Sequence, residues 1–205
     1  FSHLSKLIER LKKEKILIKH IDVGGGLGIK YSEIDEDPDI KEYGKIIERE
    51  LGKLGCKIIF EPGRYIVGNA GLLVTKVIYR KRGEKKDFVI LDCAMNDFSR
   101  PALYGAVHRI IPLKKKEKIS KILVDIVGPV CETTDTFLKD HKFDDIGQDE
   151  LCAFMDVGAY GSVLSSEYNT RPLIPEVMIS KGKFHIVRQR PSFEDMIEKE
   201  LIPDW

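Results

Sequence analysis

The residues Gly24-Gly25-Gly26-Leu27-Gly28 form a glycine cluster directly after an apolar run that ends at Val23. Glycine adopts a positive φ without strain and lets consecutive N–H groups approach an anion, so such a turn can hold a phosphate. A tight turn without any ligand is the alternative interpretation of glycines alone. The spacing excludes a dinucleotide fingerprint, which lacks its third glycine here, and a triphosphate loop, which needs a Gly-Lys-Ser/Thr end.

Further short motifs combine charged, phenolic or thiol side chains with turn residues. They are Glu61-Pro62-Gly63-Arg64, Arg100-Pro101-Ala102-Leu103-Tyr104 and Gly128-Pro129-Val130-Cys131-Glu132-Thr133-Thr134-Asp135. Arginine can bind a carboxylate or phosphate through two parallel hydrogen bonds, and proline orders the turn beside it. Taken singly, a surface Glu–Arg pair or an inert buried cysteine is an equally ordinary interpretation.

The first third of the chain alternates helical and strand patterns. We predict a helix over Leu4–Glu14, a strand over Ile16–Val23, a helix after Pro38 that ends at Gly55, and a strand over Lys57–Phe60. This alternation is typical of parallel βα units, and in an eight-stranded barrel a phosphate binds at the loops after the last two strands. We therefore expect residues 1–64 to be the last two βα units of a TIM barrel. An upstream segment would supply the other strands.

From about Tyr65 the pattern changes to short β-rich runs separated by Gly, Pro and Asp. These runs are Ile66–Arg80, Phe88–Asp92, Lys121–Val127, Leu151–Val157, Glu176–Ile179 and Phe184–Arg188. They predict that residues 65–205 form an all-β domain, either a sandwich or a barrel. A capping-box sequence, Ser192-Phe193-Glu194-Asp195, predicts a short helix from Ser192 to Leu201.

The composition argues against several classes of protein. Acidic and basic residues nearly balance, 33 against 34, and 42% of residues are hydrophobic, so neither disorder nor attraction of nucleic acid is indicated. No apolar stretch approaches the roughly 20 residues of a membrane helix. The four cysteines are widely spaced without a CxxC pair, so we expect no metal site, no disulfide scaffold and a reducing cytoplasm. The run Lys114–Lys118 is interpreted as a solvated loop.

The motifs, in this order, resemble the alanine-racemase-like, fold-type III pyridoxal-phosphate decarboxylases. Gly158-Ala159-Tyr160-Gly161 adds a further match, so the resemblance covers nearly the whole chain. Within that superfamily, the run Ser165–Pro172 followed by Pro175-Glu176-Val177 is similar to the diaminopimelate decarboxylases. Ornithine and arginine decarboxylases of this fold tend to carry Cys-Asp where this chain has Cys131-Glu132. The chain thus resembles the C-terminal half of such an enzyme.

The resemblance implies pyridoxal 5'-phosphate as the cofactor. The residues implied to bind it are Gly24, Gly25, Gly26, Glu61, Gly63 and Tyr160. The three glycines, the turn at Gly63 and Tyr160, from the β domain, would hold the phosphate. Glu61 would pair with the pyridine nitrogen, and protonation there keeps the ring an electron sink.

The resemblance also implies a substrate, meso-diaminopimelate, and a homodimer that shares its active site. Arg64, Arg100 and Tyr104 would fix a substrate carboxylate. Glu132 would recognise the distal ammonium of the substrate, reaching across the dimer interface. Cys131 would be the catalytic residue that donates a proton beside the reacting carbon.

The sequence departs from the family pattern in a few places. Gly147-Gln148-Asp149-Glu150-Leu151 stands where a glycine-aspartate turn is usual, and Val107-His108 replaces a more usual Tyr-His. No motif matches the Schiff-base lysine or the ring-stacking histidine, which the family carries near its N-terminus, and neither Lys19 nor Lys30 takes that lysine's place. We therefore expect the chain by itself to be catalytically inactive, and its exposed strand edges to favour aggregation.

Other functions stay open. One is decarboxylation of a polyamine precursor by an enzyme of the same fold, of the ornithine, arginine or carboxynorspermidine type. Another is a non-catalytic module that binds pyridoxal phosphate or regulates a partner.

Overall fold

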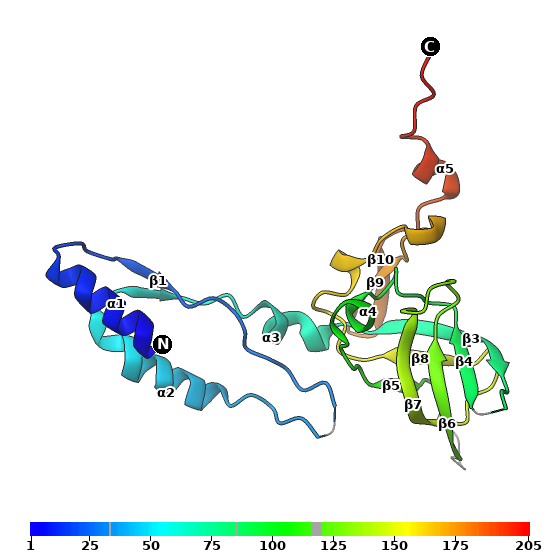
Figure 1. The fold of residues 1–205 in the computed structure, drawn as a ribbon, viewed down its shortest axis with the longest axis horizontal. Helices are drawn as coiled ribbons and strands as arrows, with labels where there is room; N and C mark the ends of the chain where they lie inside the picture. Colours follow the sequence, from blue (N-terminus) through cyan, green and yellow to red (C-terminus); the bar gives the residue numbers. More distant parts are fainter. Residues whose placement is uncertain (33, 85, 116–119) are drawn as a thin grey trace. The chain divides into compact units, whose positions relative to one another are not determined.

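A computed structural model describes residues 1–32, 34–84, 86–115 and 120–205. Its contacts divide the chain into two compact units (Figure 1). Unit 1 consists of Phe1–Leu72 and Asp156–Ala159, and unit 2 of Leu73–Met155 and Tyr160–Trp205. Most of the basic run at Lys114–Lys118 lies outside the described residues. The predicted domain boundary between Arg64 and Tyr65 stays a prediction.

Unit 1 has the predicted order of helix, strand, helix and strand. Its elements are α1 (Ser2–Lys13), β1 (His20–Asp22), α2 (Ile40–Leu51), η1 (Gly52–Leu54), β2 (Lys57–Ile59), α3 (Gly63–Val67) and η2 (Gly68–Ala70). Strands β1 and β2 are parallel, with His20 opposite Lys57 and Asp22 opposite Ile59. Helix α2 begins where the Asp39 carboxylate accepts a hydrogen bond from the Glu42 N–H at 2.9 Å.

The strand predicted over Ile16–Val23 is shorter than expected, because β1 contains only three residues. Ile16 and Leu17 are exposed, whereas Ile21 is buried together with Ile8 of α1. An apolar run forms a strand only where a neighbouring strand supplies hydrogen-bond partners, and β2 is equally short.

Unit 2 is built on one mixed sheet of six strands. Its elements are β3 (Leu73–Lys81), β4 (Asp87–Leu91), α4 (Arg100–Tyr104), β5 (Ile110–Pro112), β6 (Lys121–Val127), β7 (Thr136–Asp144), β8 (Leu151–Phe154), η3 (Ser162–Leu164), η4 (Tyr168–Thr170), β9 (Glu176–Ser180), β10 (Lys183–Arg188) and α5 (Phe193–Ile197). The sheet order is β5-β8-β3-β4-β6-β7. Among the described strand pairs of this sheet, β4–β6 is parallel and the others are antiparallel. The core of unit 2 includes the buried side chains Val77, Leu91, Ile126 and Phe154.

The structure corrects the predicted β elements in three places. The strand expected over Ile66–Arg80 begins only at Leu73, because the residues before it form α3 and η2. The strand expected over Leu151–Val157 ends at Phe154. Strands β5 and β7 were not predicted. In β7, charged residues interrupt the apolar pattern, although Phe137 is buried.

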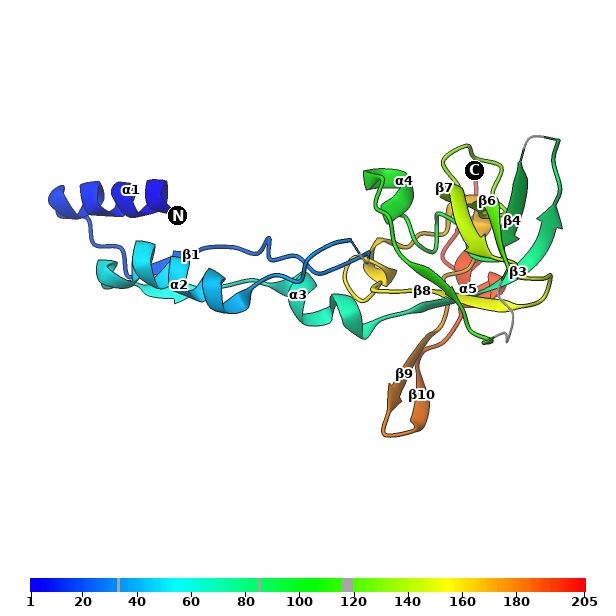
Figure 2. The same ribbon diagram turned by 90° about the horizontal axis from the view of Figure 1, so that it is seen from below.

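The remaining strands β9 and β10 form an antiparallel hairpin in which Ser180 pairs with Lys183. The two residues between them, Lys181 and Gly182, have φ of 50° and 74°, as a type I′ turn requires. Figure 2 shows this hairpin standing apart from the six-stranded sheet. The predicted capping box of α5 is confirmed by reciprocal hydrogen bonds between Ser192 and Asp195, but the helix ends at Ile197 and not at Leu201. Within the described ranges, no helix combines the length and apolar character that a membrane span requires.

Candidate functional site

In unit 1 the structure brings the glycine turn and the Glu61–Gly63 turn together. The N–H of Glu61 donates to the carbonyl of Gly24 at 2.9 Å. A Cβ on Gly25 would lie 2.6 Å from the Glu61 carbonyl oxygen, so only glycine allows this approach. Gly24 and Gly26 have φ of 71° and 85°, which also favours glycine.

This paired turn presents bare backbone, as a phosphate cradle requires. A Cβ on Gly24 or Gly26 would meet no heavy atom within 4 Å. Not every N–H is available, since that of Gly24 donates to the Asp22 carboxylate at 2.8 Å and that of Gly63 to the Glu61 carbonyl at 2.8 Å. The turn therefore fits a phosphate that is bound by backbone N–H groups of Gly25 and Gly26.

Two charged side chains lie beside the paired turn. Glu61 is exposed at the end of the segment that follows β2. Arg64 belongs to α3, and its guanidinium carbon lies 5.9 Å from the centroid of the Tyr31 ring, a cation–π distance. The sequence did not predict the contact of Tyr31 with Arg64, because no motif or regular spacing connects these two residues.

In unit 2 the first and last residues of α4 are Arg100 and Tyr104. Arg100 is 6% exposed, whereas Tyr104 is 67% exposed. The Nη1 of Arg100 lies 2.9 Å from His108 Nε2, and His108 Nδ1 lies 2.9 Å from the Met155 carbonyl oxygen. Arginine only donates and a carbonyl only accepts, so the ring carries its proton on Nδ1 and accepts at Nε2. His108 is therefore neutral and orients the Arg100 guanidinium.

The second predicted motif of unit 2 lies in the loop from Gly128 to Asp135, which joins β6 to β7. Backbone hydrogen bonds close this loop. The N–H of Gly128 donates to the Asp135 carbonyl at 3.0 Å, and the N–H of Asp135 to the Glu132 carbonyl at 3.0 Å. Cys131 and Glu132 are both exposed at its tip.

Helix α4 and this loop are neighbours, because they line one pocket of about 310 Å³. The pocket residues include Pro101, Gly105, Thr133, Thr134, Phe137 and Lys139. Unit 2 thus brings together two motifs that are separated in the sequence, the one that contains Arg100 and Tyr104 and the one that contains Cys131 and Glu132.

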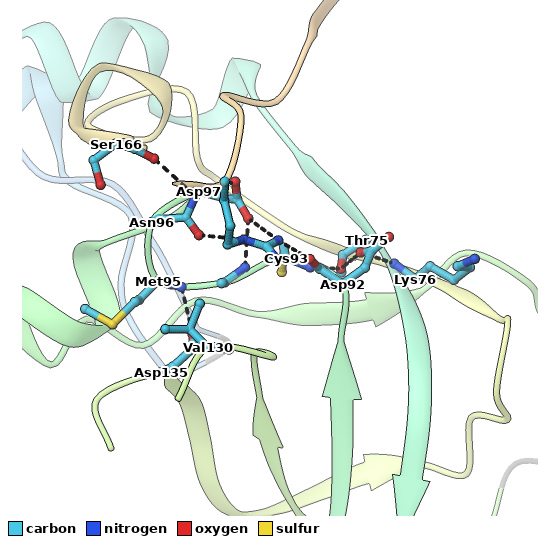
Figure 3. Close-up of polar contacts among 12 residues, drawn as sticks. Thr75, Lys76, Asp92, Cys93, Met95, Asn96, Asp97, Val130, Asp135 and Ser166 are labelled. Atoms are coloured by element: carbon cyan, nitrogen blue, oxygen red, sulfur yellow. Dashed lines mark hydrogen bonds and ion pairs between the residues drawn. The ribbon is translucent and has the colours of Figure 1, made fainter. Parts of the chain in front are cut away.

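A polar segment after β4, residues 92–97, anchors the surroundings of the loop (Figure 3). The Asp92 carboxylate accepts hydrogen bonds from the Thr75 hydroxyl at 2.6 Å and from the Lys76 N–H at 2.8 Å. The Asp97 carboxylate accepts from the Ala94 N–H at 2.8 Å. Segment 92–97 is therefore fixed to β3 on one side and folded on itself on the other.

The run Ser165–Pro172 is attached to segment 92–97 through Arg171 and Asn96. The Nε of Arg171 donates to Asn96 Oδ1 at 3.0 Å, and its Nη2 donates to the Asp92 carbonyl at 2.6 Å. The same Nη2 forms an ion pair with Asp97 at 3.4 Å. The Asn96 amide also donates to the Ser166 carbonyl at 3.1 Å.

The run also reaches the catalytic candidate itself. Asn169 Nδ2 lies 3.8 Å from Cys131 Sγ, within the range for a weak hydrogen bond to sulfur. Asn169 has φ 58°, and asparagine tolerates that left-handed conformation better than most residues. The run Ser165–Pro172 therefore touches the Cys131–Glu132 loop in space.

Burial controls the ionisation of several groups in unit 2. Burial raises the pKa of Asp135, against the effects of the Val130 and Met95 N–H groups and of the Arg171 cation. Burial also raises the pKa of Cys152 to about 12 and the pKa of Cys93 well above its usual value. Neither of these thiols is a nucleophile near neutral pH. Across the described ranges, no cluster of His, Cys, Asp and Glu could hold a metal ion.

The predicted residues thus fall into two groups. Unit 1 contains Gly24, Gly25, Gly26, Glu61, Gly63 and Arg64, and unit 2 contains Arg100, Tyr104, Cys131, Glu132 and Tyr160. Tyr160 is exposed and has φ 58°, and its contact with a phosphate stays a prediction. Sequence reasoning missed segment 92–97, and it gave no role of its own to Asp135, the last residue of the motif that begins at Gly128. The available signal was the cluster of Asp and Asn that follows β4, a frequent place for polar sites.

Known proteins are similar to this chain over nearly its whole length. The family model described as "Pyridoxal-dependent decarboxylase, C-terminal sheet domain" matches residues 31–158. A diaminopimelate decarboxylase of Aquifex aeolicus is 41% identical over 195 residues, 95% of this chain and 46% of the relative. One of Vibrio cholerae is 46% identical over 200 residues, 97% of this chain and 47% of the relative.

A solved structure agrees with these relatives. The diaminopimelate decarboxylase of Helicobacter pylori, crystallised with L-lysine, is 41% identical and superimposes with a TM-score of 0.88. The match covers 97% of this chain and 49% of that structure. The chain therefore spans about half the length of the relatives that it matches.

Proposed function

This chain belongs to the family of pyridoxal-dependent decarboxylases, whose C-terminal sheet domain it contains, and we propose that it is the C-terminal half of a diaminopimelate decarboxylase. Such an enzyme converts meso-2,6-diaminopimelate into L-lysine and carbon dioxide, the last step of lysine synthesis. One observation carries the proposal: relatives with that name match this chain at 41% and 46% identity over at least 95% of its length. The contact between Asn169 of the subfamily-specific run and Cys131 supports it.

The proposed architecture follows the same comparison. Residues 1–64 would be the last two βα units of a TIM barrel, supported by the parallel pair β1–β2 and by the paired turn at its carboxyl end. Residues 65–205 would be the β domain. The half that this chain does not cover would supply the other barrel strands and the lysine that holds the cofactor. We further propose a homodimer in the cytoplasm.

Pyridoxal 5'-phosphate fits the residues of unit 1. The paired turn would bind its phosphate through backbone N–H groups of Gly25 and Gly26, with Gly24 and Gly63 shaping the turn. Glu61 would pair with the pyridine nitrogen and hold a proton there. Tyr160 would donate a hydrogen bond to the phosphate. When bound, the cofactor supplies an electron sink for the electron pair that remains as carbon dioxide departs.

The other residues of this chain would bind substrate and move one proton. Arg64, Arg100 and Tyr104 would hold a carboxylate of the substrate, and a rigid guanidinium is well suited to this. Glu132 would bind the distal ammonium. Cys131 would donate the proton that replaces carbon dioxide on the reacting carbon, and its exposed position at the loop tip leaves it accessible.

The proposal is tested with the complete polypeptide and with the 205-residue chain alone. We expect the complete polypeptide to release carbon dioxide and L-lysine from meso-diaminopimelate, and to act far more slowly on ornithine or arginine. The chain alone should show no turnover, because the lysine that binds the cofactor lies outside it. Preference for ornithine or arginine would support the polyamine-precursor alternative. Cofactor binding without turnover of any of these substrates would support a non-catalytic module.

A further inference from the structure

One buried carboxylate, that of Asp135, fixes the loop that carries Cys131 and Glu132. Asp135 is only 2% exposed. Its Oδ2 accepts a hydrogen bond from the Val130 N–H at 2.8 Å, and its Oδ1 accepts one from the Met95 N–H at 2.7 Å. Figure 3 shows Asp135 beside Val130 and Met95. One oxygen therefore holds Val130, the residue directly before Cys131, and the other oxygen anchors Asp135 to segment 92–97.

The residue at the start of the loop is adapted to this arrangement. A Cβ on Gly128 would overlap both carboxylate oxygens of Asp135. The carboxylate thus occupies the space where any other residue would place its side chain. The pair Gly128 and Asp135 forms one packing unit under the loop.

The anchor on the other side is also fixed. Met95 lies within segment 92–97, where the Ala94 N–H donates to Asp97 and Asp97 pairs with Arg171. A continuous series of contacts therefore joins Arg171, in the run that resembles the diaminopimelate decarboxylases, to Val130. The Arg171 cation also lowers the pKa of Asp135, whereas the larger effect of burial raises it.

We propose that Asp135 is a positioning residue that fixes the backbone beside Cys131 and Glu132 and thereby supports turnover of meso-diaminopimelate. The inference rests on the proposed function of this chain and extends it to a residue that touches no substrate. Asp135 binds the N–H groups of Val130, in the loop, and of Met95, in segment 92–97. Holding the loop to this segment limits the positions that the Glu132 carboxylate can take. A displacement of about 1 Å at a binding group can cost about 100-fold in rate.

The test compares Asp135→Asn with Asp125→Asn in the complete enzyme. Asp125 of β6 is a matched control, since it is also buried and accepts a hydrogen bond from the Asp140 N–H at 2.9 Å while pairing with Lys86 at 2.7 Å. An asparagine at 135 can accept only one of the two N–H groups, because its amide nitrogen would face the other donor. The control substitution removes a similar charge without touching the loop.

We expect Asp135→Asn to lower kcat/KM for meso-diaminopimelate at least 10-fold, with cofactor affinity unchanged. Hydrogen exchange of the Val130 and Met95 amides should become at least 10-fold faster, as local opening becomes easier, and alkylation of Cys131 by iodoacetamide should change in rate. Asp125→Asn should leave all three quantities within about 2-fold, even if it lowers the melting temperature as much.

The outcomes separate this inference from the proposed function. If the unmodified complete enzyme does not decarboxylate meso-diaminopimelate, the proposed function fails, and amide exchange with Cys131 alkylation still decides whether Asp135 fixes the loop. Equal effects of the two substitutions on kcat/KM, or unchanged exchange in Asp135→Asn, overturn the inference. If Asp135→Asn does not fold, Gly128→Ala replaces it. That substitution keeps the carboxylate but displaces it, and it must reproduce the faster exchange and the lower kcat/KM.

Discussion

The hydrogen bonds of His108 can be tested one at a time, because one substitution removes the bond at Nε2 and another removes the bond at Nδ1. His108 is 2% exposed, donates from Nδ1 to the Met155 carbonyl and accepts at Nε2 from Arg100. The ring also packs edge-on against Phe98, with centroids 4.7 Å apart. Asparagine places its amide near the position of Nδ1, and glutamine reaches the position of Nε2. Hence His108→Asn removes the acceptor that His108 offers to Arg100, while His108→Gln retains that acceptor and loses the donor to the Met155 carbonyl.

The magnitude follows from the bond that each substitution removes. A hydrogen bond to a charged group contributes about 1.5–3 kcal/mol, and about 1.4 kcal/mol corresponds to a factor of ten. If Arg100 binds the substrate carboxylate, loss of its acceptor should raise KM about 10- to 150-fold. The bond from Nδ1 to the Met155 carbonyl is between neutral groups and contributes about 0.5–1.5 kcal/mol. Its loss in His108→Gln should lower stability and change KM little.

The assay measures initial rates of carbon dioxide release by the complete enzyme over a range of meso-diaminopimelate concentrations. Thermal unfolding of each variant is followed in parallel, and the absorbance of the bound cofactor shows that the site is loaded. We expect a large rise in KM for His108→Asn only, with kcat affected less. Equal values of KM for both variants, or a loss confined to kcat, would refute the reasoning that His108 orients Arg100 for substrate binding.

Further predictions concern Glu132, the glycine turn and the cysteines. Glu132→Gln in the complete enzyme should lower transition-state stabilisation for meso-diaminopimelate by about 2–5 kcal/mol; a lost cofactor absorbance band, or a kcat/KM within about 2-fold of the original, contradicts the assigned role. Gly25→Ala should weaken cofactor binding, because its Cβ would lie 2.6 Å from a carbonyl oxygen and the required backbone shift costs about 1–3 kcal/mol. Gly28→Ala is the control, since its Cβ meets nothing within 4 Å, and equal affinities would argue against the cradle. At pH 8, iodoacetamide should label Cys131 and spare Cys152, whose pKa of about 12 leaves about one thiolate in 10,000; equal rates would show that Cys152 is not protected by burial.

The elements of unit 1 could be predicted because their local patterns agree with their tertiary roles. Helix α2 begins at an Asp cap and is followed, after η1, by Gly55 with φ 75°, and both signals are readable in the sequence. The strands were predicted too long. Apolar runs such as Ile16–Val23 indicate burial, but hydrogen-bond pairing sets the length of a strand, and pairing is a property of the neighbour.

In unit 2, strand β7 was missed because it is not regularly apolar. Strand β7 pairs along nearly its whole length with β6, yet its sequence alternates irregularly and includes several charges. Register shifts interrupt the same ladder near Ile126, and a bulge moves side chains from one face to the other. A strand with bulges therefore loses the period of two on which its prediction depends.

In the candidate site, the sequence reveals the residues proposed to touch a ligand better than it reveals the residues that hold those residues in place. A phosphate cradle needs backbone N–H groups and positive φ, so the sequence marks it directly with glycines at positions 24, 25 and 26. The Cys131–Glu132 loop depends instead on a carboxylate that bonds a backbone N–H 40 residues away in sequence, at Met95. An isolated aspartate in a sequence does not reveal that partner, because any backbone N–H can donate to it. Gly128 is a second sign of this arrangement in the sequence, since the Asp135 carboxylate fills the space that a side chain at position 128 would occupy. Gly128 and Asp135 stand on either side of Cys131 and Glu132, and the buried carboxylate of Asp135 fills the space that Gly128 leaves. This pair therefore indicates that the buried carboxylate fixes the geometry of the loop.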